Sequence, residues 1–200
     1  APDDLTSVLA WMSALRAAEP EALAKVFTTR LAEDDFEGWF TLAGICERLH
    51  VELAGDMLTF ADVAEKGNEL PDFNEQERWQ ALEAVRRLYV AWLEELGLAD
   101  RHEARIEAVG RRTCRTEDTI VLIGTPELND VMRRMLEQVA DRVSVWIFAP
   151  EKLDYRFDEY GCTRADAWRE AWIDLSTDRV EIVERPADQA AAVLRAIEGY

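Results

Sequence analysis

The chain is short of the residue types that catalytic sites use most often. Its 200 residues include three lysines, two histidines and three cysteines. The lysines are Lys25, Lys66 and Lys152, and none of them follows a glycine, so the phosphate-binding loop G-x-x-x-x-G-K-[ST] is missing. The segment 124–127, Gly-Thr-Pro-Glu, does not match the dinucleotide-binding pattern G-x-G-x-x-G either. The sequence therefore excludes both common forms of nucleotide-dependent catalysis.

Metal ligands and paired cysteines are equally sparse. Cys46, Cys114 and Cys162 are far apart, so they predict neither a zinc site nor a disulfide framework. His50 and His102 are isolated in the sequence, and each is expected to be a surface or core residue rather than a ligand. We expect no metal, no cofactor and a reducing cytoplasm.

Long apolar runs are absent as well. No run approaches the ~18 residues that a membrane span needs, and the amino terminus has no signal-peptide pattern. We expect a cytoplasmic protein that does not enter a membrane, or a segment of a larger one.

Positive charge is scarce overall. With 41 acidic and 23 basic residues the formal net charge is −18, which repels phosphate backbones and predicts weak or no DNA binding by this chain alone. Two local groups depart from this balance: Arg133 with Arg134, and Arg111, Arg112 and Arg115. Such groups are usually solvated charges on a helix face, and a local basic patch is the alternative.

Residues 1–112 predict an all-helical unit. Apolar residues recur at helical spacing over 5–17, from Pro20 to 31, over 36–53, over 74–96 and over 100–111. Asn74 and Asp100 are expected to cap the last two helices, and Gly97 to end the first of these. Trp79 and Trp92, at helical spacing among leucines, are expected in the core.

The pattern changes after Cys114. Residues 119–123, 143–148 and 179–183 predict strands, and 127–140 and 188–198 predict helices. The order strand, helix, strand indicates a crossover unit with parallel strands. We predict an α/β fold: a helical unit over 1–112, then a small parallel three-layer α/β segment over 113–200.

The start of the helix after the first strand is a candidate anion site. Thr125 is expected to cap it and Pro126 to open it, which leaves backbone N–H groups that an anion could accept. Ordinary capping by Thr125, with Glu127 favourable to the helix dipole, explains the same pattern. The acidic residues Asp154, Asp158 and Glu159 match no calcium loop, so we predict no catalytic and no metal-binding residue.

Two tryptophans in the last third are candidates for an interface. Trp168 and Trp172 lie four residues apart near a polar stretch, so one of them is expected to face a partner.

Scattered short motifs resemble one family. They are Glu-Arg-Trp at 77–79, the strand ending in Gly124, Glu-Leu-Asn at 127–129, Phe-Ala-Pro at 148–150, Gly-Cys at 161–162 and Arg-Pro-Ala-Asp-Gln at 185–189. Residues 74–200 resemble the helicase-like half of the B subunit of AddAB-type helicase–nucleases, which is an inactivated superfamily I helicase.

The resemblance implies a P-loop-helicase-like core without its ATP motifs, preceded by a region like the helicase insertion domain. The acidic pair of working helicases would fall on Ile123 and Gly124, and Thr125, Glu127 and Asn129 would be further degenerate ATP-site positions. It also implies an AddA-type motor subunit and DNA as partners in the intact complex, with the nuclease domain outside these residues. Arg133, Arg134, Trp168 and Trp172 are then possible interaction residues.

We therefore expect a non-catalytic scaffold segment of a DNA repair and recombination helicase–nuclease. One alternative is a small-molecule or phosphate-binding α/β domain that uses Thr125. Another is a protein-interaction module with an exposed apolar patch near Trp39 or Trp168.

Overall fold

The helices begin where short polar side chains can cap them. In the computed structural model, which describes residues 1–27, 31–169, 171–172, 181–183 and 185–198, α1 spans Asp4–Ala17 and α3 spans Phe36–Gly55. Asp3 accepts a hydrogen bond from the backbone of Thr6, and Asp35 accepts one from Gly38, so both helices have an N-cap. Between them lies α2, Pro20–Val26, which begins with the expected proline.

The next three helices complete the helical part of the chain. Helix α4, Phe60–Lys66, starts in a capping box made by Thr59 and Asp62, and a 3-10 turn, η1, follows at Gly67–Glu69. Helix α5 spans Gln76–Glu95 and α6 spans Arg101–Gly110. Asp100 caps α6 as predicted, but the predicted cap Asn74 is wrong, because α5 begins after Glu75 without a side-chain cap.

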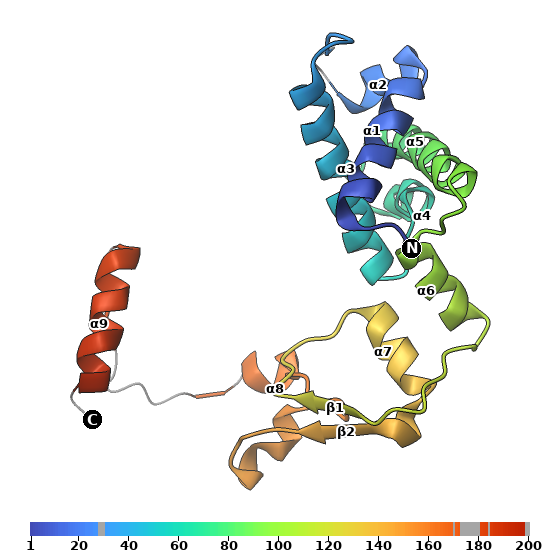
Figure 1. The fold of residues 1–200 in the computed structure, drawn as a ribbon. Helices are drawn as coiled ribbons and strands as arrows, with labels where there is room; N and C mark the ends of the chain where they lie inside the picture. Colours follow the sequence, from blue (N-terminus) through green and yellow to red (C-terminus); the bar gives the residue numbers. More distant parts are fainter. Residues whose placement is uncertain (28–30, 170, 173–180, 184, 199–200) are drawn as a thin grey trace. The chain divides into compact units, whose positions relative to one another are not determined.

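Packing of α1 against α3 and α5 forms the main core (Figure 1). At its centre Trp11 is fully buried and stacks on Tyr89, with ring centroids 4.3 Å apart. The other fully buried large side chains of this cluster are Leu15, Cys46, Phe60, Val85 and Leu93. The core placement of Trp92 was wrong: that side chain is 40% exposed, while Trp79 is half-buried against Phe60.

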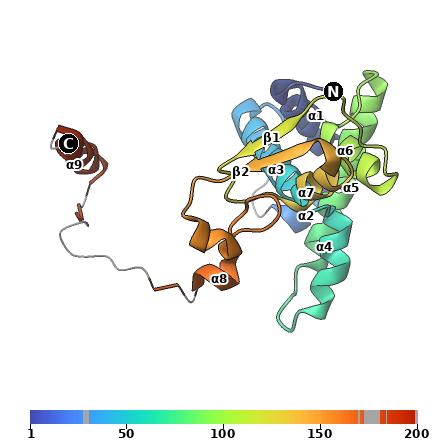
Figure 2. The same ribbon diagram turned by 90° about the horizontal axis from the view of Figure 1, so that it is seen from below.

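The strands form a small parallel sheet, as predicted. Strand β1, Ile120–Ile123, pairs directly with β2, Val143–Trp146. Helix α7, Asp130–Glu137, and a 3-10 turn, η2, at Ala140–Arg142 connect the two strands in the chain. The two strands lie side by side in both views (Figures 1 and 2). Within the described residues the sheet has these two strands. Of the third expected strand, 179–180 lie outside the described residues and 181–183 form no strand.

The rest of the chain carries short helices. A 3-10 helix, η3, spans Glu151–Arg156, α8 spans Ala165–Arg169 and α9 spans Pro186–Glu198, close to the predicted 188–198. By its contacts the chain divides into one unit of 1–148 with 159–162 and another of 149–158 with 163–200. The fold is thus mixed α/β with a helical amino-terminal part, and the domain boundary at residue 112 stays a prediction.

Candidate functional site

One face of the sheet is largely apolar and is left uncovered by the described residues. Side chains alternate along both strands, and Ile120, Leu122 and Val143 pack against a buried cluster of Leu136, Tyr160 and Cys162. On the opposite face Ile123 is 71% exposed and Trp146, its partner in register, is 65% exposed. Val121 is also exposed there, and Phe148 is fully exposed two residues beyond β2. We call Val121, Ile123, Trp146 and Phe148 the bare face.

A tight turn ends β1 beside this face. The N–H of Gly124 donates a hydrogen bond of 3.0 Å to the carbonyl of Trp146, which extends the strand pairing by one residue. Gly124 has a φ of +54°, in the left-handed region that favours glycine. A Cβ added to it would meet no atom within 4 Å, so the backbone angle rather than crowding requires glycine here.

The helix that follows begins later than predicted. Thr125 does not cap it: α7 begins at Asp130, and the side chain of Asn129 accepts the capping hydrogen bond from the backbone of Met132 at 3.0 Å. Residues 125–129 are irregular, and this lets Leu128 reach the cluster of Leu136, Tyr160 and Cys162. The candidate anion site at Thr125 thereby loses the helix start on which it depended.

The five degenerate ATP-site positions lie together along this turn and loop. Ile123 and Gly124 end β1, Thr125 is half-buried, Glu127 is exposed, and Asn129 serves as the helix cap. Neither a hydrocarbon side chain nor a glycine can bind magnesium or activate water. Their assignment to a former ATP site stays a prediction.

The two arginines of α7 are engaged within their own neighbourhood. Arg134 forms an ion pair of 2.9 Å with Asp130, one turn earlier. The guanidinium of Arg133 lies 5.2 Å from the centre of the Tyr160 ring, in cation–π geometry. Partner contacts through either residue stay a prediction.

The candidate interface tryptophans differ in exposure. Trp168 of α8 is half-buried between Arg156, whose guanidinium lies 4.7 Å from its ring, and Phe157. Its indole nitrogen is buried and, among the described residues, has no hydrogen-bond partner. Trp172 is 89% exposed. Trp172 is thus the more accessible of the pair.

Trp39, the other residue near which an apolar patch was expected, is buried. Its indole N–H donates to the carbonyl of Ala32 at 2.9 Å. An apolar hollow of about 380 Å³ lies beside it, lined by Leu23, Phe27 and Leu31 among others.

Sequence reasoning missed a buried polar cluster in the helical part. The Tyr89 hydroxyl donates a hydrogen bond of 2.6 Å to Asp100, and Nε2 of His50 lies 3.3 Å from the same carboxylate. The ring centroids of His50 and His102 are 5.8 Å apart, so the two histidines treated as isolated are neighbours. His50 is fifty residues from Asp100 in the chain, and no local pattern signals such a contact.

Electrostatics identify Asp100 as the charged centre of this cluster. Burial alone would raise the pKa of Asp100, but hydrogen bonds from His50, Tyr89 and the backbone of Glu103 outweigh it and hold the pKa well below its usual range. Burial, followed by the bond to Asp100, raises the pKa of Tyr89. Burial also lowers the pKa of His102. The cluster joins α3, α5 and α6, and this indicates a structural role.

The described part of the chain contains neither a metal-binding cluster nor a membrane-spanning helix. There, no group of three or more His, Cys, Asp or Glu side chains is placed to hold a metal ion. No helix in the same residues is both long and apolar enough to cross a membrane.

Comparisons with known proteins add no relative: no protein-family model matches the chain, and no curated protein or solved structure is significantly similar to it.

Proposed function

We propose that the chain is a non-catalytic scaffold segment of a DNA repair and recombination helicase–nuclease, with an inactivated helicase-like core. In this proposal the bare face docks against an AddA-type motor subunit. The observation that carries it is the pairing of Ile123 with Trp146 on an exposed apolar sheet face.

The usual packing of parallel sheets supports a further layer over the bare face. Parallel sheets occur almost only with both faces covered, and isolated two-stranded sheets are marginally stable. Here Leu136 of α7 covers one face together with Tyr160 and Cys162, and the described residues leave the other face open. Burying Trp146 and Ile123 against a partner would contribute about 25 cal/mol for each Å² of apolar surface removed from water. A third layer would complete the three-layer arrangement of a helicase core.

The proposed role includes no ATP hydrolysis. The end of β1, where working helicases carry an acidic pair, holds Ile123 and Gly124, and none of the chain's lysines lies in a phosphate-binding loop. The chain's charge of −18 favours contact with DNA through the assembled complex rather than through this segment alone.

The test measures binding of the full chain to a purified AddA-type motor subunit from the same source. Ile123→Glu and Trp146→Glu place a charge on the bare face and are expected to weaken binding by about tenfold or more, since a buried unpaired charge costs several kcal/mol. Leu96→Glu is the matched control, because Leu96 is a similarly exposed apolar residue at the end of α5.

Two results would contradict the proposal. One is a failure of specific binding, seen either as an equal loss in the Leu96 control or as no binding to the motor subunit by a chain whose circular dichroism shows it to be folded. The other is ATP hydrolysis by this chain alone. If the bare face is covered by a further part of the same polypeptide, the variants will instead lower the stability of the longer chain and leave motor binding unchanged.

A further inference from the structure

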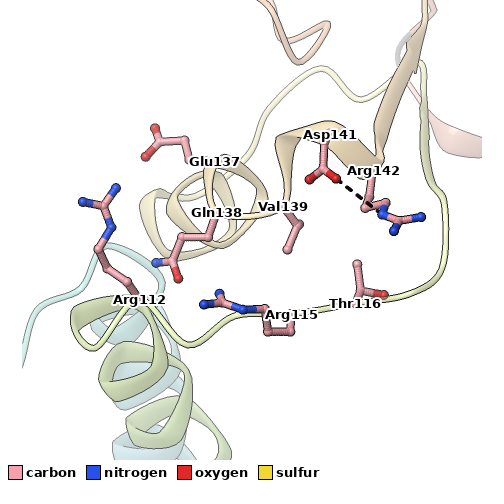
Figure 3. Close-up of a pocket in the computed structure, with 8 residues that line it drawn as sticks. All are labelled: Arg112, Arg115, Thr116, Glu137, Gln138, Val139, Asp141 and Arg142. Carbon is pink, nitrogen blue, oxygen red and sulfur yellow. Dashed lines mark ion pairs between the residues drawn. The ribbon is translucent and has the colours of Figure 1, made fainter.

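A hollow lined by three arginines opens beside the end of α6. It has a volume of about 470 Å³, within the range of small-molecule sites. Arg112 and Arg115 come from the segment after α6, while Gln138 and Arg142 come from α7 and η2 on the opposite side (Figure 3). All of its lining residues belong to the first compact unit.

Two of these arginines have no carboxylate partner among the described residues. In a chain with 41 acidic residues, Arg112 and Arg115 form no ion pair with any residue that the structure describes. Arg115 donates instead to the carbonyl of Cys114. The neighbouring Arg111, by contrast, pairs with Glu107 at 2.7 Å. Gathering unpaired cations costs Coulomb energy, which a bound anion would offset.

Arg112 also occupies an unfavourable backbone conformation. Its φ is +54°, and this left-handed conformation costs a residue with a Cβ roughly 1–2 kcal/mol relative to the right-handed helical conformation. The position closes α6, since the N–H of Arg112 bonds to the carbonyl of Val109 and that of Thr113 to Ala108. Glycine is the usual residue at such a helix end, so the presence of arginine there points to a use for its side chain.

Two hydrogen bonds of Gln138 join the two sides of the hollow. The side-chain amide of Gln138 accepts from the backbone N–H of Cys114 at 3.2 Å and donates to the carbonyl of Val109 at 3.0 Å. These two bonds tie the arginine-bearing segment to the end of α7. Gln138 therefore anchors the backbone of the segment that carries Arg112 and Arg115.

The remaining lining residues limit what can bind. Arg142 forms an ion pair of 3.5 Å with the adjacent Asp141, which leaves further N–H groups of its guanidinium available. Thr116 adds a hydroxyl, and Glu137 and Asp141 add negative charge. With three arginines and two carboxylates, the lining has a net charge of +1 and suits a compact anion.

We propose that this hollow binds a phosphate group, with Arg112 and Arg115 as its principal ligands. Planar guanidinium groups match phosphate oxygens with paired, charge-assisted hydrogen bonds. The phosphate would come from a small phosphorylated molecule or from a nucleic-acid backbone, and both present the same oxygens. This site shares no residue with the bare face, so it stands independently of the proposed docking.

The experiment titrates the full chain with pyrophosphate by calorimetry at low ionic strength. Saturable binding at one site is expected. Arg115→Gln and Arg112→Gly should each weaken it by about tenfold or more, the usual effect of losing a charged hydrogen bond. Arg111→Gln is the matched control, because Arg111 is adjacent, exposed and paired with Glu107 outside the hollow. This variant should bind pyrophosphate as tightly as the parent chain does.

Folding is controlled in the same series. Arg112→Gly relieves the left-handed strain, so its thermal midpoint should equal or exceed that of the parent while its binding falls. A short deoxythymidine oligonucleotide without terminal phosphates then distinguishes the source: competition with pyrophosphate assigns the site to backbone phosphates, and no competition assigns it to small phosphorylated molecules. Absence of saturable pyrophosphate binding, or an equal loss in the Arg111 control, overturns the proposal.

Discussion

The hydroxyl of Tyr89 on α5 donates a 2.6 Å hydrogen bond to the carboxylate of Asp100, the residue that caps α6. The same carboxylate accepts from the backbone N–H groups of His102 and Glu103, each at 2.8 Å. One side chain thus starts a helix and also ties that helix to α5 and, through His50, to α3.

Replacing Asp100 should therefore cost more than losing an ordinary cap. Asp100→Ala removes the cap and leaves Tyr89 and His50 without their buried acceptor, so we expect a loss of about 3 kcal/mol in the free energy of unfolding. Urea denaturation measures it. The control is Asp3→Ala, which removes the exposed cap of α1 and should cost only about 1 kcal/mol. Equal losses in the two variants would show that the buried contacts of Asp100 contribute nothing.

Acid should destabilise the helical part through the same residue. Because the pKa of Asp100 is lower in the folded chain than the ~3.9 of an unfolded one, its stabilisation is present above about pH 4 and is lost as the pH falls further. The pKa of His102 is lowered as well, in this case by burial. His102 therefore adds a loss of stability that starts as the pH falls below about 6.5. Denaturation curves across this range should show that the free energy of unfolding decreases as the pH is lowered. In the Asp100→Ala variant this decrease should be smaller below pH 4. A parent chain with unchanged stability at low pH would contradict this.

Glu47 is expected to act in the opposite direction. It accepts a 2.6 Å hydrogen bond from the indole of Trp11, yet burial raises its pKa more than this bond lowers it. A raised pKa means that the charged form is disfavoured in the fold, so Glu47 lowers stability as the pH rises through its folded pKa. Glu47→Gln keeps an oxygen for Trp11 and removes the charge. It should be at least as stable as the parent at neutral pH, with the difference vanishing at low pH; a clear loss at neutral pH would show that the charge itself is needed.

The two faces of the sheet should respond differently to truncation. Leu136 of α7 is buried on the covered face, so Leu136→Ala should cost about 2–4 kcal/mol. Trp146→Ala removes a larger side chain from the bare face and should cost less than about 1 kcal/mol, since that side chain is already in water. Thermal unfolding of both variants provides the comparison. A larger loss for Trp146 would mean that the face is covered within this chain.

Much of the fold could be predicted because its signals are local. Asp100 caps α6 through backbone groups two and three residues away. The β-branched and apolar runs at 119–123 and 143–148 predict strands whichever face is covered. At the Thr125 helix start the same kind of reasoning failed, because Asn129 offers a competing cap and Leu128 packs against a cluster of Leu136, Tyr160 and Cys162 that forms only in the fold.

The candidate sites depended on contacts between distant segments. The sequence by itself determined the helical and α/β halves, the excess of negative charge and the lack of a nucleotide-binding lysine, since these depend on residue type and short-range spacing. Only the tertiary structure decided that His50 meets Asp100, that Arg112 and Arg115 face Gln138 across one hollow, and that Ile123 and Trp146 share an uncovered face. Each of these relations joins residues 23 or more positions apart in the chain, where packing rather than local propensity selects the neighbour.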